Sequence, residues 1–200
     1  MTKTSPVAVK FLKIVLVRHG RPHIALAPHT THRGFGDYIT DYEAAGLDPQ
    51  SLPPQELADL ARELTAIFAS DRSRSHQSAA ALAPHVTATR DELFAEAPLA
   101  SPPIPLLRLN VPSWAVISRL LWHLGFAPGI EGWFAARRRA ERAADILVAR
   151  ARETGPVALV AHGYFNWMIG RVLKKRGFMR RGSHRARYWN TVIYERDAKD

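Results

Sequence analysis

The chain has 200 residues, 46% of them apolar, and 28 lysines and arginines against 18 acidic residues give a formal net charge of +10. Such a composition is typical of a folded globular protein. The absence of cysteine excludes disulfide frameworks and thiolate metal sites. The N-terminal residues 1–13 lack the apolar core of a secretory signal, and no segment is long and uncharged enough to span a bilayer, so we expect a cytoplasmic protein.

Strand and helix signals alternate along the chain, which favours an α/β fold: a three-layer sandwich with a mostly parallel central sheet and helices on both faces. The first half of the sequence predicts, in order, a strand over 13–17, a helix over 35–45 ended by Gly46, a helix opening at Pro53 and Pro54, a strand over 67–69, a helix over 73–83 capped by Ser73, and a strand over 86–89.

The proline-rich stretch 94–109 cannot join a central sheet, and we expect it to form a lid or wall over the site. A helix capped by Ser113 follows, with an expected apolar face of Trp114, Ile117, Leu120, Leu121 and Leu124. After it the pattern predicts a helix over 131–153 with a core stripe of Ala140, Ala144, Leu147 and Ala151, a strand over 157–160, a helix over 165–175 and a last strand over 188–194.

Two of these strands are followed by the same dipeptide, His19-Gly20 and His162-Gly163. Short valine-rich runs are typical of buried parallel strands, and ligands bind beyond the carboxyl ends of such strands. We therefore expect both imidazoles at one edge of the sheet. Glycine lets the backbone turn sharply and approach an anion, and Arg18 adds a guanidinium fork suited to phosphate. The combination indicates phosphoryl chemistry.

A third strand-to-helix junction lies at 70–79, where helix amides favour an anion. Together the three segments resemble the histidine phosphatase superfamily, also called the phosphoglycerate mutase-like family. Arg18-His19-Gly20 is similar to its Arg-His-Gly signature, 70–79 to its Ser-x-x-x-Arg-Ala-x-Gln-Thr-Ala segment with Arg74 as the arginine, and His162-Gly163 to its second histidine. Residues 190–193 look like the final strand of the family. The resemblance implies a single histidine phosphatase-like domain over 1–200.

The resemblance further implies a metal-independent phosphatase that hydrolyses a phosphomonoester or a phosphorylated protein side chain. His19 would be the nucleophile and carry the phosphoryl group as phosphohistidine. Arg18, Arg74 and His162 would surround the phosphoryl oxygens. The family takes the proton for the leaving oxygen from a carboxylic acid, for which Glu96 is the best match, with neighbouring acids at 91–92 as alternatives.

The chain departs from the family pattern after the first signature. Arg21-Pro22 stands where many members have Glu or Gln and Thr, and 31–34 replaces the usual Leu-Thr-x-x-Gly. Arg21 either binds a second anionic group of the substrate or points to solvent. Because no mutase-type specificity region is recognisable, we favour a hydrolase over a phosphoglycerate mutase-type phosphotransferase. A weak or inactive phospholigand-binding regulatory module is the other alternative.

Two further patterns have competing interpretations. His23, His29 and His32 suggest a metal site with His19, but they lie in a loop without paired carboxylates. The basic segment 171–187 would attract any polyanion and is typical of a solvated surface. We expect a phosphorylated small molecule or phosphoprotein as substrate, and neither cofactor, metal, nucleic acid nor membrane as partner. The oligomeric state stays open, with a homodimer as one option.

Overall fold

The structure is a computed structural model that describes residues 11–25 and 29–198. Within these residues six strands form one sheet in the order β3-β2-β4-β1-β6-β5. The strands are β1 (Phe11–Arg18), β2 (Ala66–Ser70), β3 (Thr89–Asp91), β4 (Val157–Ala161), β5 (Met179–Arg181) and β6 (Thr191–Asp197). The first four in chain order pair in parallel, and β6 and β5 pair antiparallel at one side. The predicted, mostly parallel sheet is confirmed.

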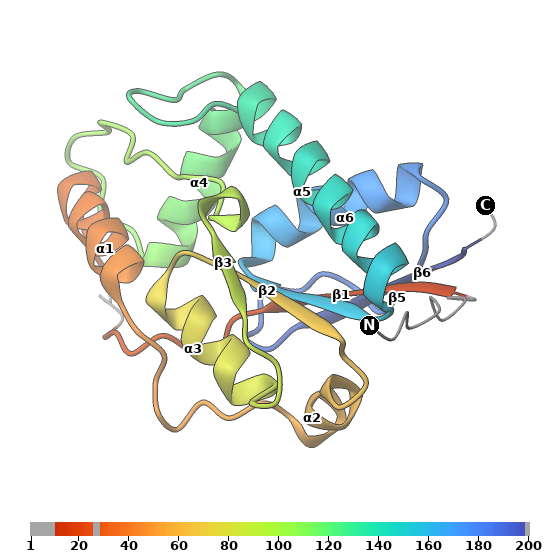
Figure 1. The fold of residues 1–200 in the computed structure, drawn as a ribbon. Helices are drawn as coiled ribbons and strands as arrows, with labels where there is room; N and C mark the ends of the chain where they lie inside the picture. The colour runs from red at the N-terminus through yellow and green to blue at the C-terminus, as the bar shows by residue number, and fades with distance from the viewer. Residues whose placement is uncertain (1–10, 26–28, 199–200) are drawn as a thin grey trace, which may run out of the picture.

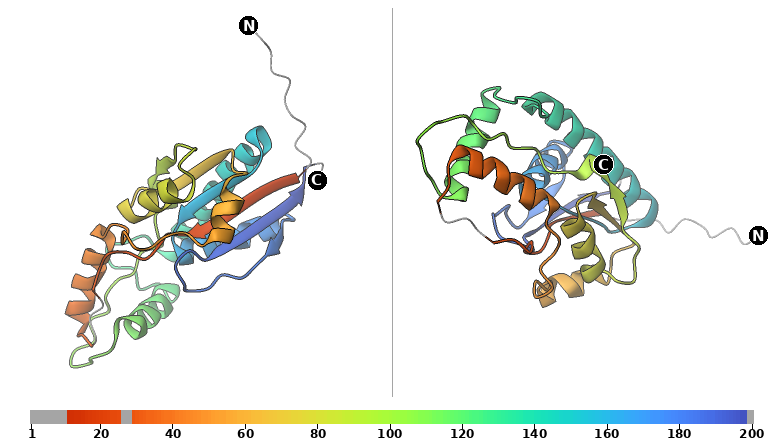
Figure 2. Two further views of the ribbon diagram at one scale, coloured as in Figure 1. Left: turned by 90° about the horizontal axis from the view of Figure 1, so that it is seen from below. Right: turned by 90° about the vertical axis from the view of Figure 1, so that its left-hand side faces the viewer.

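Helices cover both faces of this sheet (Figure 1). On one face lie α5 (Trp133–Thr154) and α6 (Gly163–Lys175), and on the other α2 (Gln55–Ala61) and α3 (Ser73–Leu82). The remaining helices, α1 (His32–Ala44) and α4 (Val111–His123), lie beyond the carboxyl ends of the parallel strands, away from the chain ends (Figure 2). The predicted three-layer sandwich is therefore present, with an extra helical cap over one end.

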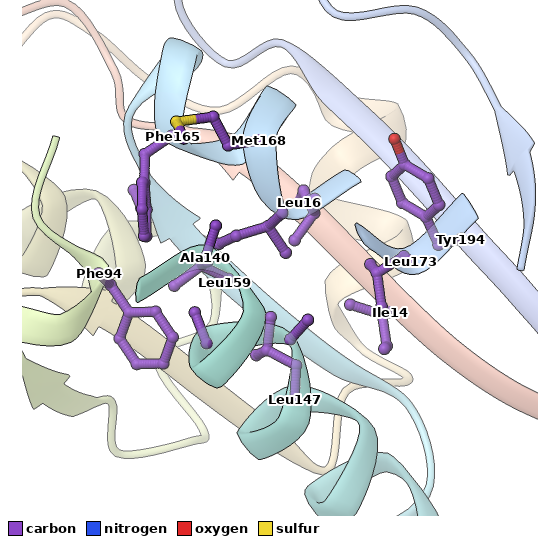
Figure 3. Packing of buried hydrophobic residues seen from close by; sticks show 14 of the residues in the cluster. Ile14, Leu16, Phe94, Ala140, Leu147, Leu159, Phe165, Met168, Leu173 and Tyr194 are labelled. Atoms are coloured by element: carbon purple, nitrogen blue, oxygen red, sulfur yellow. The ribbon is translucent and has the colours of Figure 1, made fainter. Parts of the chain in front are cut away.

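Two buried clusters hold the layers together. Side chains alternate along β1, so Ile14 and Leu16 face α5 and α6, whereas Val15 and Val17 face α2 and α3. The alanine-rich stripe predicted for α5 is buried as expected, and its small side chains let the helix approach the sheet, with Leu147 as the large side chain among them (Figure 3). Truncating a fully buried leucine of this kind costs about 2 to 5 kcal/mol.

The buried face of α4 differs from the predicted one. The helix is capped by Asn110, whose side chain accepts a hydrogen bond from the Ser113 amide at 2.9 Å, so Ser113 is not the cap. Trp114 and Trp122 are fully buried and set the phase of the helix. Of the predicted apolar face, Ile117 and Leu121 are half-buried, and Leu120 and Leu124 are 60% and 83% exposed. The predicted burial of Trp114 is confirmed, but Trp122 was not on the predicted face, and its burial turns Leu120 and Leu124 towards solvent.

One helix start and one helix cap were also predicted wrongly. The α1 helix begins at His32 rather than at residue 35, because Thr31 caps it by accepting from the Gly34 amide at 3.4 Å. It ends at Ala44, before Gly46. For α3, residue 72 takes the cap position without a side-chain cap bond, and Ser73 is the first helical residue. The Thr31 bond is a local cap within the first turn of α1, a signal that the prediction overlooked.

The edge strands were the hardest to predict. β3 begins at Thr89 and not at residue 86, and its three residues are exposed, so no apolar pattern marks it. β5 was not predicted. β6 begins at Thr191 rather than 188, because Trp189 has a φ of 58°, which no strand residue adopts.

No helix in the described ranges is long and apolar enough to cross a membrane. The prediction that residues 1–13 lack a secretory signal concerns mainly residues 1–10, which lie outside the described residues. Residues 26–28 of the predicted loop before α1 also lie outside them.

Candidate active site

The two His-Gly dipeptides meet at the carboxyl end of the sheet. β1 and β4 are parallel neighbours with Arg18 opposite Ala161, so His19 and His162 follow at the same level. The amide of His19 donates to the carbonyl of Ala161 at 2.9 Å. The two imidazole centroids are 5.1 Å apart, and each residue is only 1% exposed. The structure therefore brings both histidines into one buried site.

The backbone fixes the tautomer of His19. Its Nδ1 lies 2.7 Å from the carbonyl oxygen of Gly20. A carbonyl can only accept, so Nδ1 carries the proton and Nε2 carries the lone pair. Burial lowers the pKa of His19 well below 6.5, and the nearby Arg74 and Arg18 lower it further. At neutral pH the ring is thus uncharged, with a nucleophilic nitrogen at Nε2.

The second histidine is held by the end of β2. Its Nε2 and the hydroxyl of Ser70 share a hydrogen bond at 2.8 Å. Burial lowers the pKa of His162 well below 6.5, and the nearby His19, Arg74 and Arg18 lower it further. Both imidazoles are therefore neutral in the folded chain, because two adjacent imidazolium ions could not be accommodated beside buried arginines.

Arg74 lies in the first turn of α3, is 0% exposed, and is bound from four directions. Its Nε donates to Nε2 of His19 at 3.4 Å, and its Nη1 to the carbonyls of Tyr42 and Glu43 at 2.6 and 3.1 Å. Its Nη2 donates to the Glu43 carboxylate at 3.0 Å. The end of α1 thus fixes this guanidinium against the nucleophilic nitrogen.

Arg18 approaches from the other side of the site. Its Nη1 donates to the carbonyl of Ala186 at 2.7 Å, and its buried Nε has no hydrogen-bond partner within the described part of the chain. Its side chain runs past Gly163, where an added Cβ would come within 3.3 Å of the Arg18 Cδ. A buried donor without an acceptor, next to His19, is suited to a ligand oxygen.

The glycines of the two dipeptides serve close packing, not a sharp turn. Neither has a positive φ. A Cβ on Gly20 would lie 2.6 Å from Leu47 and 2.7 Å from Trp189, whereas Gly163 makes room for Arg18. The expectation that these glycines let the backbone turn sharply is therefore wrong.

Glu96 is placed beside the site, at the N-terminus of α6. Its Oε1 accepts from the amide of Phe165 at 2.8 Å and from its neighbour Ala97 at 2.9 Å, and its Oε2 from the amide of Tyr164 at 3.3 Å. This places the carboxylate over the first turn of α6, the helix that follows His162. The alternatives at 91–92 are exposed. Glu96 is thus the one of these acids whose carboxylate binds amides of the helix that follows His162.

Sequence reasoning missed Glu43, the carboxylate that contacts the arginines directly. Its Oε1 binds Arg74, and its Oε2 is 2.7 Å from Nε of Arg72. It lies in the last turn of α1, which matched no family motif, so only the folded chain brings it to the site. Missed as well were Tyr42 and Tyr188, whose rings lie 6.3 and 6.0 Å from the His19 ring.

The other candidate residues lie outside this group. Arg21 is paired with Asp48, its Nε at 2.9 Å and its Nη2 at 2.8 Å from Oδ2, and its side chain is 54% exposed. In 11–25 and 29–198 no three His, Asp or Glu side chains are placed to hold a metal ion, so the loop histidines are not gathered around His19. In the basic segment 171–187, Arg176 pairs with Asp145 at 2.8 Å and Arg181 with Glu195 at 2.8 Å.

The buried histidines make stability depend on pH. The folded-state pKa of His19 and of His162 lies below 6.5, so in mild acid the unfolded chain binds more protons than the folded one. Their contribution is complete above pH 6.5 and is lost as pH falls towards the folded-state values. We expect the free energy of unfolding to decrease between pH 7 and 5, by up to about 1.4 kcal/mol per pH unit for each histidine.

Urea denaturation at several pH values measures this dependence, and His19→Asn provides the comparison. The free energy of unfolding should depend less on pH in the variant than in the wild type. The difference corresponds to up to one proton fewer taken up on unfolding. Parallel curves for the two proteins would show that His19 is not a buried, neutral imidazole.

Comparison with known proteins supports this picture. The profile of the histidine phosphatase superfamily (branch 1) matches residues 14–199. Mycobacterial glucosyl-3-phosphoglycerate phosphatase is similar in structure, with a TM-score of 0.54 and 20% identity over 83% of this chain and 81% of that one. A protein from an open reading frame of Mycobacterium tuberculosis has a TM-score of 0.54 and 18% identity over 90% and 89%. A phosphoserine phosphatase variant from Entamoeba histolytica has a TM-score of 0.54 and 12% identity over 93% and 94%. No curated protein sequence gave a significant match. At these identities the solved structures show the fold alone.

Proposed function

Since this chain belongs to the histidine phosphatase superfamily (branch 1), we propose that it is a metal-independent phosphatase that hydrolyses a phosphomonoester, or a phosphorylated protein side chain, through a phosphohistidine on His19. The observation that carries the proposal is the Nε2 of His19, a buried unprotonated nitrogen with Arg74 at 3.4 Å. Fixed guanidinium groups beside a nucleophile are suited to a phosphoryl group, whose charge is spread over three oxygens.

In the first step the Nε2 lone pair attacks phosphorus in line with the ester oxygen. The N–P bond forms while the P–O ester bond breaks, and the ester oxygen takes a proton and leaves as an alcohol. The Gly20 carbonyl keeps its bond to Nδ1–H and stabilises the positive ring. The free Nε–H of Arg18, the Arg74 guanidinium and His162 bind the phosphoryl oxygens.

In the second step water attacks the phosphohistidine. The N–P bond breaks, orthophosphate leaves, and His19 regains its neutral tautomer. Glu96 is assigned both proton transfers: it donates to the leaving oxygen in the first step and takes a proton from water in the second. The assignment rests on its place next to His162.

Leaving-group dependence tests the assignment of Glu96. We expect Glu96→Gln to lower kcat about 100-fold or more on an alkyl phosphate, whose alkoxide must be protonated, and only a few-fold on p-nitrophenyl phosphate, whose leaving group needs no proton. Glu43→Gln is the matched comparison, because this carboxylate also lies at the site. If Glu43→Gln alone shows the leaving-group dependence, the acid is Glu43 and not Glu96.

Orthophosphate release from a panel of phosphomonoesters, in the presence of a chelator, tests the function itself. Turnover that survives chelation supports the proposal. Orthovanadate binding without turnover of any ester would instead support a phospholigand-binding module, and recovery only with added divalent metal would contradict the mechanism. Transfer of the phosphoryl group to a second alcohol in place of water would indicate a phosphotransferase.

A further inference from the structure

Two tyrosines from segments far apart in the sequence lie beside the nucleophile, and a third packs against one of them. Tyr38 and Tyr42 lie on successive turns of α1, with ring centroids 5.8 Å apart, and Tyr188 precedes β6. The rings of Tyr42 and Tyr188 lie 6.3 and 6.0 Å from the His19 ring. We call Tyr38, Tyr42 and Tyr188 the tyrosine collar. All three are half-buried, so each keeps some surface that a ligand can reach.

The phosphate-binding arginines hold this collar in place. The guanidinium carbon of Arg18 lies 4.7 Å from the ring centre of Tyr188, and that of Arg74 lies 4.5 Å from the ring centre of Tyr42. Such cation–π contacts are worth about 0.5 to 2 kcal/mol each. Each arginine that would bind the phosphoryl group therefore also orients one aromatic ring next to it.

The backbone around Tyr188 is strained to present this ring. The next residue, Trp189, has a φ of 58°, a conformation that costs a residue with a side chain about 1 to 2 kcal/mol. Its amide donates to the carbonyl of His19 at 3.4 Å, and its indole Nε1 to the hydroxyl of Ser51 at 3.1 Å. These bonds and its burial against Gly20 keep Tyr188 attached to the segment that carries the nucleophile.

Carboxylates neutralise Arg72 and Arg74 beside the collar. Glu43 already pairs with Arg74 and with Arg72, and Arg72 also lies 3.8 Å from Asp71. Further along, Arg21 is paired with Asp48. The hydroxyls of Tyr38 and Tyr188 are neutral, because burial and the neighbouring tyrosines raise the pKa of Tyr38 to about 12 and that of Tyr188 above its usual value. The alcohol part of a substrate thus meets aromatic rings and carboxylates.

We infer that the tyrosine collar is the leaving-group subsite of His19, and that it selects a phosphomonoester of a phenol or arylmethyl alcohol without a second anionic group. The inference rests on the proposed function, since it assigns the same His19 as the phosphoryl acceptor. Aromatic rings packed edge-to-face or offset against the collar gain about 0.5 to 1.5 kcal/mol beyond the burial of their surface.

Phosphonates test the subsite without any hydrolysis, so differences in leaving-group reactivity play no part. We expect benzylphosphonate to bind about 10-fold more tightly than propylphosphonate, and 3-phosphonopropionate, which carries a second anion, to bind most weakly, as measured by calorimetry. Equal binding of benzylphosphonate and propylphosphonate, or tightest binding of 3-phosphonopropionate, would overturn the inference.

Variants of the collar assign the preference to its residues. Tyr42→Leu and Tyr188→Leu should each reduce the benzyl-to-propyl ratio to about 3 or less, whereas Tyr42→Phe and Tyr188→Phe should keep it. A ratio unchanged in both leucine variants would place the aromatic subsite elsewhere. The outcome is separable from the proposed function: selective phosphonate binding without turnover of any ester would contradict the phosphatase alone, and turnover without aromatic selectivity would contradict the subsite alone.

Discussion

Replacing His19 by asparagine is expected to lower kcat by at least about four orders of magnitude. The asparagine amide can still donate to the Gly20 carbonyl that binds Nδ1, so the local backbone keeps its hydrogen bond. It has no nitrogen lone pair at the position of Nε2, and the phosphoryl group then has no covalent acceptor. The residual rate would come from binding and from the two arginines.

His23→Asn is the matched control, because His23 is exposed and lies four residues further along. It should leave kcat within about two-fold, as expected for a surface position away from the chemistry. The account of the nucleophile would be wrong if His19→Asn kept kcat within tenfold of the wild type while remaining folded by circular dichroism.

Replacing Arg74 by lysine should lower kcat about 1,000-fold, although the charge is kept. One ammonium cannot replace a guanidinium that contacts Nε2 of His19, two carbonyls of α1 and the Glu43 carboxylate at once. The variant should also be less stable, by about 1 to 3 kcal/mol, because acceptors buried at the end of α1 lose their donor. Steady-state kinetics and urea denaturation measure the two effects separately.

Arg72→Lys is the comparison for this variant. Arg72 pairs with the same carboxylate, but its side chain is 40% exposed and makes no contact with His19. We expect kcat within about fivefold of the wild type and little change in stability. A similar loss of kcat in both variants would mean that activity depends on the ion pair with Glu43. It would contradict the role given to the contact between Arg74 and His19.

The central strands and the edge of the sheet at which the histidines meet could be predicted because they depend on local sequence. The apolar runs before His19 and His162 are buried on both faces, so no choice of face had to be made. For α4 such a choice was needed, and it depended on where Trp114 packs, which is against Phe35 of α1 at a ring distance of 6.0 Å. Several helices and strands separate the two residues along the chain, so the contact has no local signature.

The same reasoning explains which site residues were found. His19, Arg74 and His162 follow strands in recognisable motifs, whereas Glu43 and the collar tyrosines lie on α1 and in the segment before β6, which no motif marks. Their positions depend on how α1 packs over the end of the sheet (Figure 2). The residues proposed to bind the phosphoryl group could therefore be found from the sequence, whereas those proposed to meet the leaving group required the fold.

Trapping the covalent intermediate tests the central claim most directly. The wild type is mixed with excess p-nitrophenyl phosphate, quenched in alkali within the first turnovers, digested and examined by mass spectrometry. Phosphate should be found on Nε2 of His19, formed as fast as p-nitrophenolate appears and absent in His19→Asn. Phosphate on any other residue, or turnover without protein-bound phosphate in the first turnovers, would contradict the account.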